Sequence, residues 1–338
     1  MKALVTGGTG FLGSHIAERL ARRGDLVRAL VRPTSDTSFL ESLGGVEFVR
    51  GDVTDEASLT PALSGVDVVY HAAAMVSDWG PWEDFRSVTV NGTRNTLRAA
   101  TGAGVGRFLY VSTDGVYRYK DLRRGVTEES ELETHFGPFD YYRKSKTIAE
   151  RIVRRHLDMG DLPITIVRPA LVLGERDRSM LPGTIAFLKS SGPVYLGNGR
   201  NRLPIVYAGD VAELCILAAT SGQAIGQIYN TVNEEYVTQR DFFQSAAEAS
   251  GLQLPKRSMP FRVVYAIVFA MELRSRLRNW KPRPELTRFS ANLLGVDFVE
   301  TAEKAHRELG WQPEVGFREA VRRSVEWARA RRAEKVSG

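Results

Sequence analysis

A tyrosine and a lysine four residues apart are the side chains of this sequence best placed to move a proton. Tyr142 and Lys146 lie in a stretch with helical periodicity over residues 142–156, where positions i and i+4 share one face. A phenol ordinarily titrates at about pH 10, so it needs a neighbouring positive charge to carry protons at neutral pH. This spacing of tyrosine and lysine occurs once in the chain, and it predicts general acid and base chemistry at Tyr142.

Two hydroxyl side chains, Ser112 and Thr113, stand at the end of an apolar run that predicts a strand over residues 108–112. Parallel sheets bind ligands at the carboxyl ends of their strands, so these hydroxyls are expected near Tyr142 and a bound substrate. Asp114 and Tyr117 follow directly, and both are predicted to contact the substrate.

A glycine-rich turn, Gly7-Gly-Thr-Gly10-Phe-Leu-Gly13, joins a predicted strand over residues 2–6 to a predicted helix over residues 14–23. Glycines here permit a tight turn, a close approach of the backbone to a pyrophosphate, and close packing of helix on strand. The free N–H groups and positive dipole end of the helix then face the phosphates. The turn therefore predicts a dinucleotide site formed by Gly7, Gly10, Phe11, Leu12 and Gly13.

The end of the second predicted strand, residues 26–31, favours one dinucleotide over the other. An acidic residue there bonds the adenosine ribose of NAD, whereas NADP needs a cation for its 2′-phosphate. Arg32 holds this position, and a guanidinium both pairs with phosphate and stacks on adenine. The sequence therefore favours NADP(H), while Asp36 leaves NAD(H) open and a solvent-facing Arg32 is the simpler alternative.

The elements that must position these residues alternate between strand and helix, which is typical of a parallel sheet covered on both faces. We predict an α/β fold, a Rossmann-type doubly wound parallel sheet with a smaller C-terminal substrate lobe. The predicted sheet domain covers residues 1–168 and about 203–232, and the predicted substrate lobe covers about 169–202 and 233–338. Further strands are predicted at 46–49, 67–71, 164–168 and 228–232, and further helices at 57–63, 85–100 and 211–219.

Composition excludes several classes of function. The hydrophobic and charged fractions, 43% and 25%, are those of an ordinary soluble protein. The net charge of +6 comes from residues 256–288, whose nine basic and two acidic side chains give +7, so the remainder sums to −1 and no nucleic acid partner is expected. Cys215 is the single cysteine, no metal-ligand cluster is visible, and the first strand begins at residue 2. We therefore expect a cytoplasmic protein without disulfides or a bound metal.

Six motifs in order give the chain its resemblance to a known family. They are Thr6-Gly-Gly-Thr-Gly-Phe-Leu-Gly13, His71-Ala-Ala-Ala74, Asn91-Gly-Thr, Ser112-Thr113, Tyr142-x-x-x-Lys146 and Arg168-Pro169. Over residues 1 to about 235 the sequence resembles an extended short-chain dehydrogenase/reductase, a member of the NAD-dependent epimerase/dehydratase superfamily.

That resemblance implies roles for individual residues. Tyr142 is the general acid and base, Lys146 holds the nicotinamide ribose and lowers the pKa of the tyrosine, and Thr113 orients the substrate oxygen, although the family more often has serine there. The implied cofactor contacts also include Asp52 and Val53 at the adenine, the groove wall Ala72, Ala73 and Ala74, and Ser112, Arg168 and Pro169.

Departures from the family pattern indicate a branch. Sugar-nucleotide epimerases resemble one another in an asparagine soon after the sixth strand and in an arginine that grips the diphosphate. Here the sixth strand is followed by no asparagine, and Leu203 falls where that arginine would stand, with Arg202 one residue away as a substitute. The pattern is closer to the 3β-hydroxysteroid dehydrogenase group, which includes sterol-4-carboxylate 3-dehydrogenases and 2-alkyl-3-oxoalkanoate reductases.

We therefore expect an enzyme that moves hydride between a nicotinamide and a secondary alcohol or ketone on a small lipophilic molecule. Trp79 and Trp82 are predicted as aromatic walls of the substrate pocket, with ordinary packing as the alternative. A sugar-nucleotide epimerase or dehydratase that retains NAD and a non-catalytic NADP sensor are the two rival classes. A homodimer is left open.

The basic segment begins with an apolar run over residues 261–271 and continues into Arg274, Arg276, Arg278, Trp280, Lys281 and Arg283. Eleven apolar residues are too few to span a bilayer but enough to lie in its interface, with tryptophan at headgroup level and arginines on anionic lipid. Peripheral membrane contact through 261–283 is one expectation, and a core helix with a solvated basic end is the other.

Overall fold

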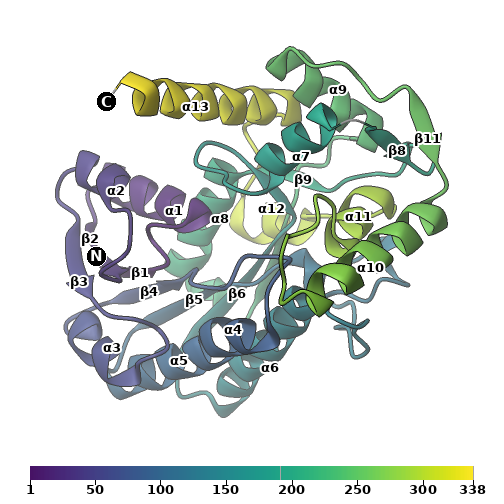
Figure 1. Cartoon of the computed structure of the whole chain (residues 1–338). Coiled ribbons are helices and arrows are strands. Elements are labelled where there is room, and N and C mark those ends of the chain that lie inside the picture. The colour runs from purple at the N-terminus through teal and green to yellow at the C-terminus, as the bar shows by residue number, and fades with distance from the viewer. Residues whose placement is uncertain (191, 338) are drawn as a thin grey trace.

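The chain, seen in a computed structural model that describes residues 1–190 and 192–337, is built around a seven-stranded parallel sheet (Figure 1). The strand order is β10-β6-β5-β4-β1-β2-β3. Six strands come from the first half of the chain, and the seventh joins one edge from much later. Their bounds are β1 Lys2–Thr6, β2 Leu26–Val31, β3 Glu47–Arg50, β4 Val68–His71, β5 Arg107–Val111, β6 Ile164–Pro169 and β10 Ile228–Thr231.

Helices cover both faces of this sheet, and the side-chain alternation of β1 shows why (Figure 1). Ala3 and Val5 point into one core with α1 and α8, while Leu4 points into a second core with α3, α5 and α6. Successive side chains of a strand face opposite sides, so a sheet that is covered on both faces has strands that are apolar at most positions. The covering helices are α1 Phe11–Arg22, α3 Glu56–Leu63, α5 Gly92–Gly102, α6 Tyr141–Met159 and α8 Ala208–Thr220.

A separate hydrophobic core lies outside the sheet, formed by residues from 171–207, 237–252, 293–294 and 315–325. It includes two small parallel pairs, β7 with β9 and β8 with β11, and helices that pack around them. The elements of this region are β7 Leu171–Leu173, β8 Val194–Leu196, β9 Ile205–Tyr207, β11 Arg257–Met259, α7 Met180–Lys189, α9 Gln239–Ser250, α11 Arg288–Gly295 and α13 Phe317–Ser337. Helix α10, Phe261–Leu277, packs on β8 and α11 in a small cluster of its own, and α12, Glu303–Leu309, packs in the sheet core that contains α1 and α8.

The predicted α/β fold with a Rossmann-type parallel sheet is confirmed. Two details differ from expectation. The predicted helix over 85–100 is α4, Trp82–Phe85, followed by a π-helical segment, Arg86–Asn91, and only then by α5. The apolar run at 261–271 continues helically to residue 277. The division into two lobes with the boundaries given above stays a prediction.

Candidate active site

The glycine turn that follows β1 lies against the segment that follows the neighbouring strand β4. Gly7 has a left-handed backbone, φ +71°, and a Cβ built on it would lie 2.8 Å from the backbone nitrogen of Ala73. A Cβ on Gly13 would lie 2.1 Å from the carbonyl oxygen of Gly7, so the start of α1 can touch the turn only without a side chain. The turn therefore lies directly against the backbone of Ala72 and Ala73, and the assignment of Ala72 to Ala74 to the wall of a cofactor groove stays a prediction.

The N-terminus of α1 is built to receive an anion. Gly10 is the N-cap residue, and it has no side chain to satisfy the first N–H groups of the helix. Those groups belong to Phe11, Leu12 and Gly13, and both Phe11 and Leu12 are only partly buried. Since exposed N–H groups and the helix dipole favour a phosphate, the turn fits the pyrophosphate of a dinucleotide.

Thr113 and Tyr142 come together at the carboxyl end of β5. The backbone N–H of Gly115 donates to Thr113 Oγ1 over 3.2 Å, and Thr113 Oγ1 donates to Asp114 Oδ1 over 3.1 Å. Tyr142 lies near the start of α6, half-buried. Burial raises the pKa of Tyr142 to about 12, although a hydrogen bond with the Thr113 hydroxyl opposes the rise. The phenol of Tyr142 is thus protonated at neutral pH, and its hydroxyl group lies beside the hydroxyl group of Thr113.

Lys146 lies one turn further along α6 and is buried. Its Nζ donates to the carbonyl oxygen of Val111 over 2.7 Å, and burial lowers the pKa of this ammonium to about 8, against the opposing charge of Glu150. The resemblance implied that Lys146 lowers the pKa of Tyr142. In the structure, burial raises the pKa of Tyr142, and the Lys146 ammonium donates to the sheet backbone. The effect of Lys146 on Tyr142 stays a prediction.

Arg143 is a positioning residue that the sequence reasoning missed. Its guanidinium is buried and donates to the carbonyl oxygens of Gly115 and Tyr117, both over 2.7 Å, and it pairs with Asp140. It thereby fastens α6 to the loop that carries Thr113. An arginine next to Tyr142 was visible in the sequence, but no periodicity indicates which backbone carbonyls such a side chain reaches.

A buried polar network behind the site uses several residues that were expected to touch ligands. Ser112 Oγ donates to Glu150 over 2.5 Å, Glu150 and Arg168 are both fully buried and pair at 2.6 Å, and Arg168 Nη1 donates to the Tyr117 hydroxyl over 2.7 Å. The Tyr117 hydroxyl donates onward to Asn230 Oδ1 over 2.6 Å, which reaches the edge strand β10.

This network corrects three of the sequence expectations. Tyr117 and Arg168 are 0% exposed, so neither has the accessible surface that a contact with substrate or cofactor needs. Pro169 is buried within β6. Their hydrogen bonds and packing instead connect β5, β6, β10 and α6. Ser112 contributes to these connections through its hydrogen bond to Glu150.

Asp114 is buried beside Thr113 with one carboxylate oxygen, Oδ2, that has no hydrogen-bond partner. Burial raises its pKa to about 7, while Thr113, Gly115 and Arg143 act in the opposite direction. Glu300 lies close enough for its own pKa, already raised by burial, to rise further because of Asp114. The site thus holds a carboxyl group that changes protonation near neutral pH, next to the two hydroxyls.

The carboxyl end of β2, where the adenosine of a cofactor was predicted, has an exposed cation and an ion-paired carboxylate. Arg32 follows β2 and is exposed. Asp36 is paired with Arg331 of α13 at 2.7 Å and with Arg178 at 3.6 Å. On the neighbouring strand end, Asp52 Oδ1 accepts from the Thr54 N–H over 2.9 Å.

Val53 closes the groove beside α5. A Cβ on Gly92 would lie 2.7 Å from Val53 Cγ2, and the Val53 carbonyl oxygen accepts from Asn95 Nδ2 over 3.0 Å. His71, ahead of the alanine wall, is held between the hydroxyls of Thr6 and Thr93 at 2.8 and 3.1 Å. The residues predicted to bind the cofactor thus follow the carboxyl ends of the neighbouring parallel strands β4, β1, β2 and β3, and their contact with a cofactor stays a prediction.

A pocket of about 380 Å³ lies next to Tyr142, and we call it the aromatic pocket. Phe289 from α11 lines it and packs edge to face on Tyr142, with ring centroids 5.3 Å apart. Its other aromatic walls are Tyr119, Phe139, Phe261 and Tyr265, and its polar wall includes Arg143, Glu272 and Arg288. Most of these residues could not be predicted from the sequence, because the pocket is lined by separate segments with no common spacing.

Trp79 and Trp82 are not among the residues that line the aromatic pocket. Trp79 Nε1 donates to the Trp280 carbonyl oxygen over 3.0 Å, and the two indole rings pack edge to face at 5.2 Å. Trp82 packs on Tyr141 and under the ammonium of Lys144. These positions match the packing alternative rather than the predicted pocket walls.

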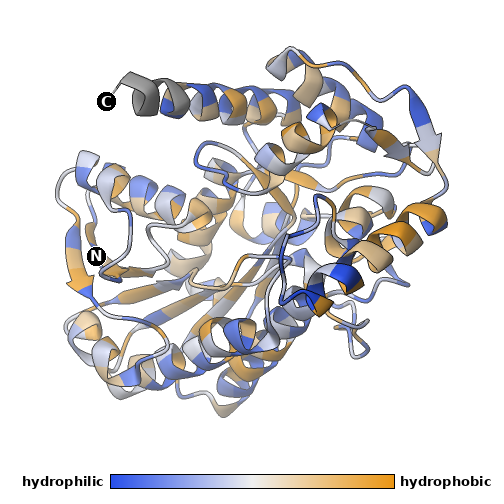
Figure 2. Ribbon diagram, viewed as in Figure 1, coloured by the Kyte–Doolittle hydropathy of each residue, from blue (hydrophilic) through white to orange (hydrophobic). Residues whose placement is uncertain are grey.

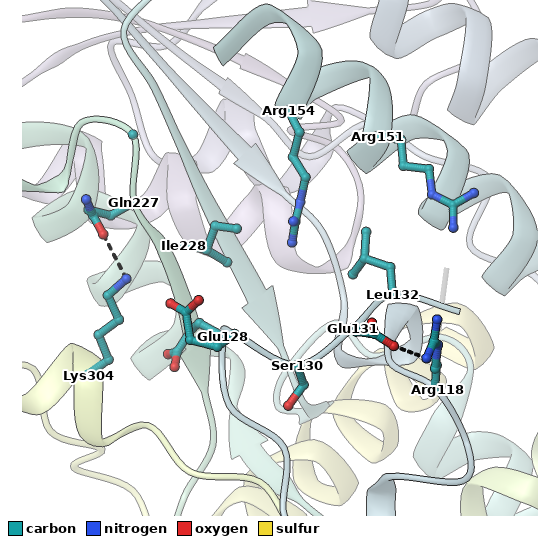
Figure 3. Close-up of a pocket in the computed structure, with 12 residues that line it drawn as sticks. Arg118, Glu128, Ser130, Glu131, Leu132, Arg151, Arg154, Gln227, Ile228 and Lys304 are labelled. Carbon is teal, nitrogen blue, oxygen red and sulfur yellow. Dashed lines mark hydrogen bonds and ion pairs between the residues drawn. The ribbon is translucent and has the colours of Figure 1, made fainter. Parts of the chain in front are cut away.

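A second pocket, of about 510 Å³, lies beside the edge strand β10 and α6 (Figure 3). Its walls are charged with both signs, and they include an Arg118 to Glu131 ion pair and a bond from Lys304 to Gln227. Neither pocket is lined by Thr113, Tyr142 or Lys146. The aromatic pocket is the better candidate for the substrate site, because its wall residue Phe289 packs on the Tyr142 ring. Within the described residues, no group of three or more ligating side chains could hold a metal ion.

The comparisons with known proteins agree with this geometry. Residues 3–231 match the model of the NAD dependent epimerase/dehydratase family. A 2-alkyl-3-oxoalkanoate reductase of Stenotrophomonas maltophilia is 30% identical over 96% of this chain and 98% of its own length. A 3 beta-hydroxysteroid dehydrogenase/Delta 5-->4-isomerase of Mycobacterium tuberculosis is 30% identical over 92% of this chain and 86% of its own.

A solved structure supports the fold. A double mutant of the dTDP-glucose 4,6-dehydratase DesIV from Streptomyces venezuelae, with NAD bound, superposes with a TM-score of 0.77 at 24% identity, over 99% of this chain and 98% of that one. The family model covers well over half of the chain. In this chain the glycine turn, the Ser112-Thr113 pair and the start of the helix with Tyr142 and Lys146 all lie at the carboxyl ends of the strands. The chain therefore belongs to the NAD-dependent epimerase/dehydratase family and is an NAD(P)-dependent oxidoreductase of the extended short-chain dehydrogenase/reductase type.

Proposed function

We propose that this enzyme interconverts a secondary alcohol and a ketone on a lipophilic molecule, with Tyr142 as the proton carrier. The proposal rests on one observation: the Tyr142 and Thr113 hydroxyl groups lie within hydrogen-bonding reach of each other, beside a pocket lined by Phe139, Phe289 and Tyr265. Two hydroxyls can bind one substrate oxygen, and aromatic walls bind an apolar body. The reductase and dehydrogenase names of the similar proteins agree with this reading.

In the reducing direction, Tyr142 donates its proton to the carbonyl oxygen while Thr113 holds that oxygen in place. The raised pKa of Tyr142 suits this role, because the phenol is protonated and able to donate at neutral pH. A nicotinamide, when bound, supplies or accepts the hydride. The Lys146 ammonium lies at the end of β5, where it donates to the carbonyl oxygen of Val111. From this position we expect it to hold the ribose, as the family resemblance implies.

The cofactor we propose is NADP(H). Arg32 is exposed at the end of β2, where a 2′-phosphate would need a cation. Asp36, the carboxylate that would instead bond the ribose of NAD, is already paired with Arg331 and Arg178. An occupied carboxylate surrounded by guanidinium groups favours a phosphate over a free ribose hydroxyl.

A sugar-nucleotide substrate fits less well. The arginine that was considered as a substitute for the diphosphate grip, Arg202, is bound to Asp297 through two contacts of 3.1 Å. A pure cofactor sensor has no use for Thr113, Tyr142 and Lys146 in the arrangement described.

The test is Tyr142→Phe, assayed with NADPH against a panel of 2-alkyl-3-oxoalkanoates, 3-ketosteroids and UDP-glucose. We expect turnover of one of the ketones by the unchanged enzyme, and a fall of about 10²–10⁴-fold in the variant, because a proton carrier is removed. Cofactor affinity and thermal stability should stay unchanged.

Tyr141→Phe is the matched control, since Tyr141 packs on Phe85 and Trp82 away from Thr113. Near-normal turnover in Tyr142→Phe, or an equal loss in Tyr141→Phe, would remove Tyr142 from its role. Turnover of UDP-glucose alone would replace the lipophilic substrate class with sugar nucleotides.

A further inference from the structure

Helix α10 exposes apolar side chains along most of its length. Six large ones, Val263, Ile267, Phe269, Met271, Leu273 and Leu277, are between 38% and 81% exposed. Figure 2 shows the helix as a mostly orange ribbon whose far end turns blue. Only Val264, Val268, Glu272 and Ser275 are buried, so the alternative expectation of a core helix does not fit.

Every exposed residue of α10 is either apolar or basic. Apart from apolar side chains, the exposed set contains only Arg262 and Arg274, and exposed Arg278 and Lys281 follow the helix. The one acidic residue, Glu272, is turned inwards, where it pairs with Arg288 at 2.9 Å. The face presented to solvent is therefore apolar and positively charged, with no carboxylate of its own.

Three residues that were expected on this face are used elsewhere, and one of them, Arg283, pairs with Asp78 at 2.6 Å. The Arg276 guanidinium stacks on the Phe139 ring at 3.4 Å, and desolvation by burial lowers its pKa to about 10. Trp280 packs against Trp79. The exposed cations are thus Arg262, Arg274, Arg278 and Lys281, and the apolar contact comes from the aliphatic residues and Phe269.

We propose that this face of α10 docks on an anionic lipid surface. An apolar helix face lies among the headgroups and upper acyl chains, and each cation near the surface adds attraction to anionic lipid. A second copy of the chain is the less suitable occupant, because two like faces would bring their positive charges together without a carboxylate between them. Among the described residues no helix is both long and apolar enough to cross a bilayer, so the contact is peripheral.

The aromatic pocket opens beside the same helix. Phe261, Arg262, Tyr265 and Ala266 of α10 line it, and Phe289 connects it to Tyr142. If the substrate is lipophilic, which rests on the proposed function, docking places the pocket beside the phase in which that substrate dissolves. The docking itself depends only on the exposed face.

The test is co-sedimentation of the full-length chain with two kinds of vesicle, phosphatidylcholine alone and phosphatidylcholine mixed with phosphatidylglycerol. We expect binding to the mixed vesicles at low salt, little to the neutral ones, and weakening at high salt. Arg274, Arg278 and Lys281 changed together to Gln should weaken binding by about 100-fold, since each cation near the surface contributes roughly a factor of five. Ile267→Gln with Met271→Gln should weaken it as well.

The matched control changes three exposed arginines of other helices, Arg22, Arg98 and Arg155, to Gln, which removes the same charge and should leave binding unchanged. No sedimentation at low salt, equal binding to neutral vesicles, or an equal loss in the control would overturn the proposal. So would a dimer, seen by analytical ultracentrifugation, that Ile267→Gln with Met271→Gln dissociates. Turnover of a water-soluble ketone should stay unchanged in the docking variants, so this outcome is independent of the Tyr142 test.

Discussion

Asp114→Asn tests the electrostatics of the site through protein stability. The wild-type carboxyl is fully buried next to Thr113, and its Oδ2 has no partner. A group whose folded pKa is raised binds a proton that the unfolded chain has lost, so stability is present below the unfolded pKa and is lost as the pH rises through the folded value. Asparagine keeps the shape and the Oδ1 acceptor for Thr113 but never ionises.

The size of the effect follows from the two pKa values. The difference between the ordinary value of 3.8 and the folded value of about 7 corresponds to about 4 kcal/mol of stability. Wild type therefore loses about 4 kcal/mol because of this group between about pH 4 and pH 7, and nothing further above pH 7. Asp114→Asn should have wild-type stability at the acid end and about 4 kcal/mol more at pH 8.

The measurement is urea denaturation of both proteins across this pH range, with Asp158→Asn as the control for loss of an exposed carboxyl. Buried carboxyls that do not interact with Asp114 contribute equally to the pH dependence of both proteins and cancel in the difference. Glu300 does not cancel: its pKa is raised partly by Asp114, so the substitution lowers that pKa and adds stability to the variant in the same direction at high pH. A difference between variant and wild type that is constant with pH would refute the reasoning, because it would mean that Asp114 has the same pKa folded and unfolded.

Three other substitutions test the rest of the site. Arg32→Asp should lower the ratio of kcat/KM with NADP to that with NAD, because it removes a phosphate partner and adds a like charge; an unchanged ratio would mean that Arg32 only faces solvent. Glu150→Gln should destabilise the fold by about 3–5 kcal/mol in urea denaturation, because it leaves the Arg168 guanidinium buried without its charge partner, and a much smaller loss would contradict that pairing. Gly7→Ala should lower both the melting temperature and cofactor affinity, since its Cβ would press on Ala73, whereas Gly24→Ala, with φ +84° and open space around it, carries the backbone strain alone. Equal losses at the two glycines would argue against the contact.

The sequence predicted the sheet well because its strands are apolar runs of strand length bounded by turn residues. Each of β1, β2, β4 and β6 lies within a residue of its predicted range, since burial on both faces leaves no other pattern at those positions. The glycine turn and the Tyr142 to Lys146 spacing were visible for the same reason: local backbone geometry demands particular residue types at short range.

What the sequence could not predict depends on contacts between distant segments. Arg168 was assigned to the cofactor from its motif, but its partners Glu150 and Tyr117 lie 18 and 51 residues away and satisfy it in the core. The aromatic pocket draws Phe139, Tyr265 and Phe289 from three segments with no shared period. Which face of the 261–277 helix is buried was likewise undecided, because a helix that is apolar all round carries no amphipathic signal.

The position of β10 in the sheet has a consequence for synthesis of the chain. β6 pairs with β5 on one side and with β10 on the other, yet residues 170–227 separate β6 from β10 in sequence. While the ribosome adds those residues, at about 5–20 per second, β6 is an edge strand with its apolar side chains and its outer backbone groups unpaired. The hydrogen-bond network of Arg168 is also incomplete in that interval, because the Tyr117 hydroxyl that accepts from Arg168 has its own acceptor, Asn230, only after β10 has been synthesised. For several seconds during synthesis, the sheet of the nascent enzyme therefore has an exposed edge strand that is prone to aggregation. The yield of folded enzyme in the cell depends on how quickly the next 60 or so residues are added.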